Sequence, residues 1–152
     1  STRRGSKNAR RHRMGQPAMV ENVRKSINIE SFEHINPIPA ATRIGPYVTC
    51  SITPPYNSGT RELPETLEEQ IDNLFIHVGQ MLDGAGARWG DVAKMTFYVT
   101  DPATSRDALN GPWEQHFPDP ACRPSRHNLK VPGNGPVLIS CDFVAFVTDE
   151  PN

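Results

Sequence analysis

The sequence predicts a single α+β domain in which two helices pack on one face of a β-sheet. One long segment, residues 67–82, repeats apolar side chains every three or four positions, which is typical of an amphipathic helix. Segments before and after it alternate apolar and polar residues, as half-buried strands do. Clusters of Pro, Gly and Asn separate these segments, and 152 residues suffice for one hydrophobic core.

The first third of the chain contains two strand candidates. Residues 27–32 alternate briefly and favour an edge strand. Pro37 and Pro39 then require an extended or turning chain, because proline lacks an amide donor and restricts the residue before it. A second strand is predicted over residues 44–52 and ends at the paired prolines 54–55.

The clearest predicted element is the helix that follows. Its apolar face consists of Leu67, Ile71, Leu74, Val78 and Leu82. Pro64 and Glu65 are typical of a helix start, and Gly84 with Gly86 is typical of a helix end.

The second half of the chain predicts a strand, a helix and two further strands. Residues 91–100 alternate and end at Asp101-Pro102. Thr104 or Ser105 can cap a helix over residues 104–117, which Gly111-Pro112 should kink or restart. Strands over residues 126–131 and 137–147 flank a Pro/Gly turn. Both helices therefore cover one sheet face, and the uncovered face predicts an oligomer whose subunits cover one another.

Charge is distributed unevenly. Residues 1–18 hold six of the 16 basic residues and no acid, so residues 19–152 carry ten basic against 17 acidic residues. We interpret 1–18 as a basic flexible segment, either a native tail or an extension added by cloning, and 19–152 as the folded domain. The acidic domain argues against nucleic acid as the partner. No window could span a bilayer and the three cysteines lack CxxC spacing, so we expect a cytoplasmic protein without membrane contact.

Two arginines near the predicted fifth strand are the leading candidate site residues. Arg123 and Arg126 follow a proline-rich loop, and a guanidinium matches a carboxylate with two parallel hydrogen bonds. Asp142 and Ser140 interrupt the apolar run of the last strand and share one side of it. Asp142 could handle protons. The structural alternatives are that the arginines bond to backbone carbonyls or form surface ion pairs, and that Asp142 pairs with an arginine.

Several motifs together resemble the RidA (YjgF) family of small trimeric deaminases, over residues 35–147. They are Asn36-Pro37-Ile38-Pro39 through Gly45, Glu69-Gln70 with Asn73-Leu74, Gly84-Ala85-Gly86 with Asp91 to Thr96, Asn110 with Trp113 and Phe117, and Arg123-Pro124-Ser125-Arg126. The resemblance implies a chorismate-mutase-like α+β fold with a mixed sheet of about six strands, a homotrimer, and three clefts at the subunit interfaces.

The resemblance also implies a reaction. In the family, an arginine of a Pro-Ala-Arg motif binds the carboxylate of an enamine or imine, which water hydrolyses to a 2-oxo acid and ammonia. Pro124-Ser125-Arg126 is the closest match, so Arg126 is preferred. Counting back from Pro132 selects Arg123, which is kept as the second candidate. Asn128, two residues beyond Arg126, is included as a possible substrate contact.

This chain departs from the family pattern in three places. A family glutamate falls at Ser140 in an ungapped match, and Asp142 on the same side of the strand could replace it. Ile44-Gly45-Pro46-Tyr47 spells a family string, but its distance from the helix assigns Tyr47 to the following strand and makes it a weak candidate. Cys50-Ser51 stands where the family has Ser-Gly, so the cleft should differ in shape there.

The implied chemistry needs no cofactor. His116, Asp119, Cys122 and His127 match no standard zinc spacing, and Cys122 beside two arginines is a minor candidate nucleophile. The expected partner is a small carboxylated substrate. Two alternatives remain open: a non-enzymatic module that binds 2-oxo acids, and a ribonuclease-like or RNA-binding protein.

Overall fold

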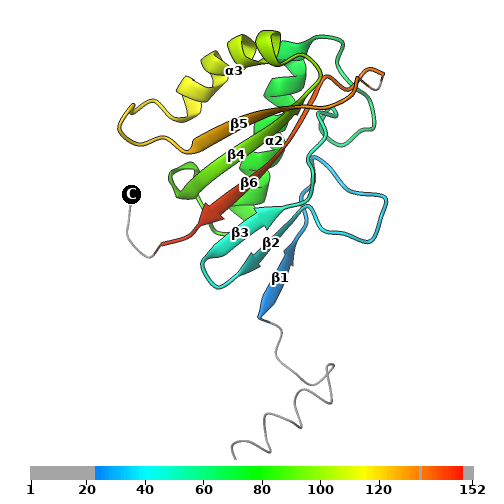
Figure 1. Ribbon diagram of the computed structural model, residues 1–152. Helices are drawn as coiled ribbons and strands as arrows, with labels where there is room; N and C mark the ends of the chain where they lie inside the picture. Colours follow the sequence, from blue (N-terminus) through cyan, green and yellow to red (C-terminus); the bar gives the residue numbers. More distant parts are fainter. Residues whose placement is uncertain (1–22, 134, 149–152) are drawn as a thin grey trace, which may run out of the picture.

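The computed structural model describes residues 23–133 and 135–148 (Figure 1). The basic segment 1–18 lies outside these residues. The elements are β1 (Arg24–Ile27), β2 (Ala41–Ile44), β3 (Tyr47–Cys50), α2 (Leu67–Gly84), the 3-10 turn η2 (Trp89–Asp91), β4 (Val92–Val99), α3 (Pro102–His116), β5 (Ser125–Lys130) and β6 (Ile139–Phe146). None of the helices in the described part of the chain is long and apolar enough to cross a bilayer. The α+β prediction is confirmed.

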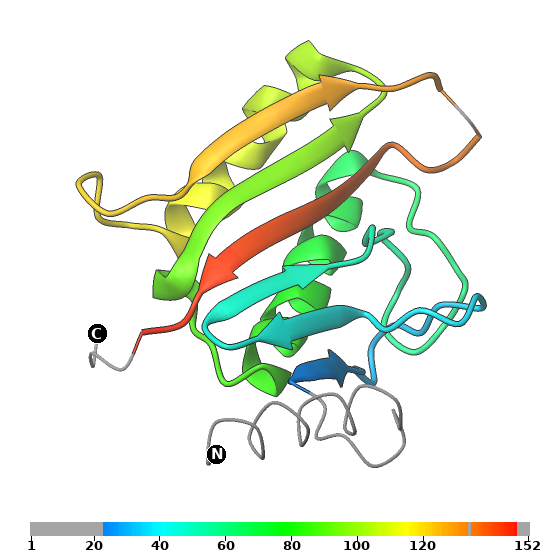
Figure 2. The ribbon, with the colours of Figure 1, turned by 60° about the horizontal axis from the view of Figure 1, so that its bottom comes forward.

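All six strands form one mixed sheet in the order β1-β2-β3-β6-β4-β5 (Figure 2). Only β4 and β5 are parallel; the other neighbours run antiparallel. The two last strands of the sequence, β5 and β6, are therefore not neighbours, because β4 lies between them. This order leaves β5 at one edge of the sheet.

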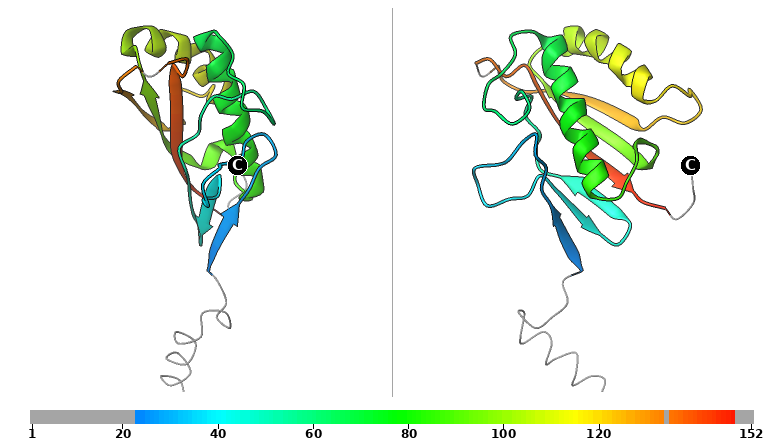
Figure 3. Two further views of the ribbon diagram at one scale, coloured as in Figure 1. Left: turned by 90° about the vertical axis from the view of Figure 1, so that its right-hand side faces the viewer. Right: turned by 180° about the vertical axis from the view of Figure 1, so that it is seen from behind.

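Both helices cover the same face of the sheet (Figure 3). Helix α2 begins after Thr66, whose side chain accepts a hydrogen bond from the Glu69 amide, and it ends before Gly86, which has a φ of 71°. The buried side chains of α2 and α3 pack against inward-facing residues of β3, β4 and β6. The fully buried ones include Ile71, Leu74, Val78, Leu109, Met95, Phe97, Ile139 and Cys141.

Two elements of the N-terminal region differ from the prediction. The expected strand 44–52 is a hairpin, because Gly45 adopts a φ of 55° and turns the chain between β2 and β3. The expected strand 27–32 is instead β1, which ends at Ile27. Phe32 lies in the following loop, where it stacks on Tyr56 and is buried.

Helix α3 starts earlier than predicted and is not interrupted. Its N-cap is Asp101, and Pro102 occupies the first turn, where a missing amide proton costs nothing. Thr104, the predicted cap, donates its hydroxyl proton to Asp101 Oδ2 at 2.8 Å. Pro112 lies inside the helix, which continues to His116. The predicted restart of the helix at Gly111-Pro112 is therefore absent.

Candidate functional site

The face of the sheet that neither described helix covers (Figure 3), called the uncovered face below, carries a polar pair at its centre. Asp142 of β6 lies opposite Thr96 of β4, and Tyr98 lies opposite Ser140. The Tyr98 hydroxyl donates a 2.7 Å hydrogen bond to Asp142 Oδ2. That bond to the carboxylate, together with burial, raises the pKa of Tyr98 to about 12. Asp142 therefore holds a neutral phenol at its side, and its second oxygen, Oδ1, makes no hydrogen bond within residues 23–133 and 135–148.

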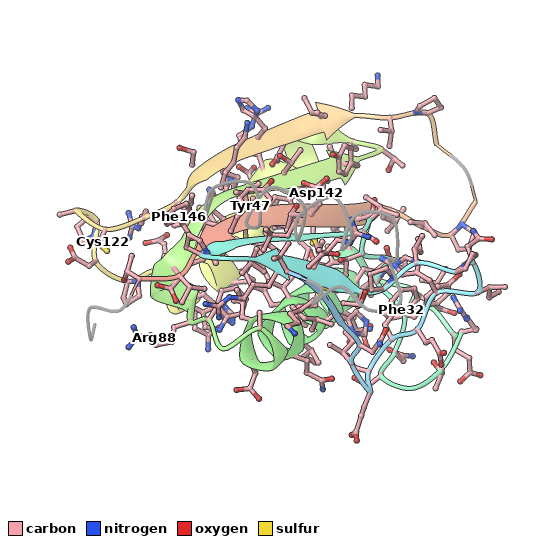
Figure 4. The ribbon with its side chains drawn as sticks, turned by 90° about the horizontal axis from the view of Figure 1, so that it is seen from below. Phe32, Tyr47, Arg88, Cys122, Asp142 and Phe146 are labelled. Carbon is pink, nitrogen blue, oxygen red and sulfur yellow. The ribbon has the colours of Figure 1, made fainter. Side chains whose placement is uncertain are left out.

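Exposed apolar side chains surround this pair on the same face. Strand alternation and the pairing registers assign Ile44, Tyr47, Leu129 and Phe146 to it, and each is between 43% and 54% exposed. Figure 4 shows Tyr47, Asp142 and Phe146 over the sheet. Tyr47 is the first residue of β3, the following strand to which the sequence assigned it. Several exposed apolar side chains gathered on one sheet face are typical of a surface that another protein covers.

Arg123 lies in the loop that precedes β5 and is exposed. Its Nε donates to the Phe117 carbonyl at 2.8 Å, and its Nη2 lies 3.4 Å from the Pro118 carbonyl. These two bonds fix the guanidinium against the end of α3. Nη1 makes no hydrogen bond within the described part of the chain, so the group can still receive an anion from one side.

Arg126 lies on the opposite face of the sheet from Asp142. It pairs in register with Met95, which faces the helices and is fully buried. Its Nη2 donates to Asn110 Oδ1 at 2.9 Å, and its guanidinium lies 5.1 Å from the Trp113 ring centre, so it packs on α3. The structure thus separates the preferred arginine from Asp142 and Ser140 within one subunit.

The remaining candidates are also dispersed. Asn128 faces the helices with Arg126, in register with Phe97. Ser51 donates its hydroxyl proton to the Pro39 carbonyl at 2.8 Å. Burial raises the pKa of the half-buried Cys50 thiol to about 12, which leaves it protonated at neutral pH. Neither Cys50 nor Ser51 contributes a free polar group to the Asp142 face.

The four residues considered for a zinc site, His116, Asp119, Cys122 and His127, do not form one. His116 stacks on Phe75, with ring centres 4.4 Å apart, and its Nδ1 bonds to the Pro112 carbonyl. Cys122 is exposed at the outer loop before β5 (Figure 4). Within residues 23–133 and 135–148, no three His, Cys, Asp or Glu side chains are placed to share a metal ion.

Sequence reasoning missed the partner of Asp142. Alternation already assigned Tyr98 to the polar side of its strand, but the pairing of β4 with β6 was needed to bring Tyr98 to Asp142. It also missed the surroundings of Arg126. Those depend on how α3 lies over the edge strand, which no local pattern encodes.

The fold and these residues agree with a known family. The family model described as Endoribonuclease L-PSP matches residues 28–136, and the chain belongs to this family, which is the RidA/YjgF family. A RutC family protein from Aquifex aeolicus is 28% identical over 97 residues, which is 64% of this chain and 77% of that protein.

Solved structures give the same architecture. The YjgF gene product of E. coli is 25% identical, with a TM-score of 0.71 over 82% of this chain and 99% of that one. E. coli TdcF with bound serine is 24% identical, with a TM-score of 0.71 and the same coverage. The single-domain α+β fold with a six-stranded mixed sheet and two helices is therefore shown, and family membership is shown independently of it.

Proposed function

We propose that this protein is a hydrolase that converts a small carboxylated enamine or imine to a 2-oxo acid and ammonia. The proposed site is a cleft between copies of the chain in a homotrimer. The observation that carries the proposal is the Tyr98–Asp142 pair at the centre of an uncovered, apolar-rimmed sheet face. Exposed apolar side chains on one sheet face support a protein partner, and family membership supports a second copy as that partner.

Arg123 is the proposed carboxylate clamp. Arg126 is set aside for this role because it lies on the helix side of the sheet, bound to Asn110. The Phe117 and Pro118 carbonyls hold the Arg123 guanidinium in one orientation while leaving Nη1 available. A pre-oriented guanidinium binds a carboxylate at a lower entropic cost than a mobile one.

Asp142 is the proposed water-positioning group, with Ser140 beside it. The substrate's imine carbon is already electrophilic, so the protein must mainly orient a water molecule against it. Water adds its oxygen to that carbon and transfers a proton toward nitrogen. The C–N bond then breaks, ammonia leaves, and the oxygen from water becomes the carbonyl oxygen. Asp142 accepts and returns the proton through Oδ1, while Tyr98 fixes Oδ2.

The arginine and the acid that serve one substrate come from different subunits. Asp142 of β6, Thr96 of β4 and His127 of β5 lie side by side on three neighbouring strands. Arg123 precedes His127 by four positions along the chain. Arg123 and Pro124 lie in the loop before β5, and four residues span about 13 Å when extended, which exceeds the length of a small carboxylated imine. This separation favours a neighbouring copy as the source of the second group.

Variants of Arg123 test the clamp. The substrate is 2-aminoacrylate, generated in the cuvette by a cysteine or serine lyase, and 2-oxo acid formation is followed. Arg123→Ala should lower kcat/KM about 10- to 100-fold, the effect of losing a charge-assisted hydrogen-bonded pair. Arg123→Lys should recover only part of the activity, since lysine cannot form the bidentate contact. Parent-like activity in Arg123→Ala would rule out the clamp.

A binding module for small acids is the second candidate. The relative TdcF is known with bound serine, which is a small carboxylated molecule. Saturable 2-oxo acid binding that Arg123→Ala abolishes, without turnover of any imine, would favour it over catalysis. The family description names an endoribonuclease, but the ten basic against 17 acidic residues of 19–152 disfavour a phosphate-backbone ligand.

A further inference from the structure

A second polar site lies on the helix side of the sheet, away from Asp142. A cavity of about 230 Å³ opens between the first turns of α3 and the edge strand β5. Its lining consists of Pro102 and Arg106 from α3 and of Arg126 and Asn128 from β5. Figures 1 and 2 show α3 lying along this edge of the sheet.

The strand pattern calls for apolar residues at the two β5 positions. Arg126 pairs with Met95 and Asn128 pairs with Phe97, and both partners are fully buried in the core. A parallel neighbour on the same face would ordinarily be Val or Ile. This chain instead has a guanidinium and an amide there. Polar groups in such a position cost stability unless a partner satisfies them.

The two arginines bring positive charge together without an acid. Arg106 is close enough that its charge adds to burial in lowering the pKa of Arg126. Neither arginine forms an ion pair with a carboxylate of residues 23–133 or 135–148. Their mutual repulsion would be relieved by an anion between them.

Arg126 is held in place for such a ligand. Its Nη2 donates to Asn110 Oδ1 at 2.9 Å, and its guanidinium stacks over Trp113 at 5.1 Å. Asn110 and Trp113 are positions of α3 on the same side of the helix as Arg106. The guanidinium therefore presents its remaining donors with little freedom to lose on binding.

The side-chain amide of Asn128 restricts which ligand could bind in this cavity. Both its Nδ2 and its Oδ1 are buried and lack a hydrogen-bond partner within the described residues. Leaving a buried polar atom unsatisfied destabilises the fold. A bound molecule that accepts from Nδ2 and donates to Oδ1 would satisfy both atoms. A carboxylate with a neighbouring hydroxyl group provides both, whereas an ammonium group would be repelled by the arginines.

We propose that Arg106, Arg126 and Asn128 form a binding site for a small hydroxy-carboxylate, separate from the catalytic cleft. The sheet itself stands between this site and Asp142, so the two ligands do not compete for the same atoms. The site belongs to each subunit alone. Its existence does not depend on the proposed deaminase activity.

The test uses the full chain, with lactate as the probe and propionate as the matched acid without a hydroxyl group. Calorimetry and amide NMR should show saturable lactate binding that shifts the Asn128 side-chain amide signals. Propionate should bind at least about threefold more weakly, because Asn128 Oδ1 then stays unpaired. Arg106→Gln should weaken lactate binding about tenfold or more and leave imine hydrolysis unchanged. Arg24→Gln, an exposed arginine of β1, should leave lactate binding unchanged.

Asn128→Asp keeps the test decisive if other variants unfold. A carboxylate of almost the same shape would bond to both arginines, so we expect a higher Tm together with loss of lactate binding. Three results would each overturn the proposal: no saturable binding by the parent at tens of millimolar lactate, equal binding by Arg106→Gln and the parent, or a lower Tm for Asn128→Asp.

Discussion

Gln70 connects helix α2 to the segment that leads into β6, and its loss should be costly. Its side chain is fully buried. Nε2 donates to the Pro64 carbonyl at 3.0 Å and to the Pro136 carbonyl at 2.8 Å. Oε1 accepts from the Leu138 amide at 2.9 Å. One side chain thus fixes the residues just before the strand that carries Ser140 and Asp142.

The substitution Gln70→Leu keeps the volume and removes all three hydrogen bonds. It leaves the Leu138 amide without its partner, at about 1–3 kcal/mol, and removes bonds to two carbonyls at about 0.5–1.5 kcal/mol each. We therefore expect a loss of about 2–6 kcal/mol in the free energy of unfolding. At about 2–4 °C per kcal/mol for a chain of this size, Tm should fall by roughly 4–24 °C.

Denaturant titration followed by circular dichroism measures this loss, with calorimetry for Tm. Gln115→Leu, at an exposed position of α3, is the matched control and should stay within about 0.5 kcal/mol of the parent. If Gln70→Leu also stays within 0.5 kcal/mol, the three hydrogen bonds do not stabilise the fold and this reasoning fails.

Three further predictions concern ionisable groups. Because the pKa of Tyr98 is raised, its hydrogen bond to Asp142 stabilises the fold below the unfolded tyrosine pKa of about 10, and this contribution is lost as pH rises toward about 12. Alkaline unfolding should therefore depend less on pH in Tyr98→Phe than in the parent. An unchanged profile would contradict the bond to Asp142. The ring nitrogens of His77 bond to Ser31 Oγ and to the Tyr56 carbonyl, and burial lowers the pKa of the ring. The neutral ring therefore contributes to the free energy of unfolding above about pH 6.5, and this contribution is lost on acidification. Urea titrations at pH 7.5 and 5.0 should show this loss in the parent and less of it in His77→Gln; equal losses would contradict it. A thiol reagent should react quickly with exposed Cys122 and only after unfolding with Cys50 and Cys141, whereas more than one fast thiol in the native protein would refute this assignment.

Elements with a strong local pattern were predictable. The face of α2 from Leu67 to Leu82 repeats with helical spacing, and the alternation in residues 91–100 marks β4, so both appear close to the expected positions. The hairpin was missed because residues 44–52 have a strand-like composition and a single glycine, Gly45, turns the chain. The start of α3 was missed because Asp101-Pro102 indicates a strand end and a helix start equally well.

The candidate site was predictable in composition and not in geometry. Alternation along β6 correctly put Ser140 and Asp142 on one side of the strand. The sides taken by Arg123 and Arg126 depend on where β5 begins, and a strand start at Ser125 turns Arg126 toward α3. A shift of one residue in the position of the strand turns each side chain to the other face of the sheet, and the local sequence does not determine the strand position to within one residue. The tyrosine partner of Asp142 required the β4–β6 pairing, a contact between residues 44 positions apart.

The central claim is that Arg123 of one subunit and Asp142 of another act on the same substrate. Arg123→Ala and Asp142→Asn are prepared separately, each expected to hydrolyse 2-aminoacrylate poorly, and are then unfolded, mixed in equal amounts and refolded together. Random assembly into a trimer joins an intact Arg123 with an intact Asp142 at about one cleft in four, so the mixture should recover about a quarter of the parent's activity. A mixture no more active than the two variants alone would contradict the account.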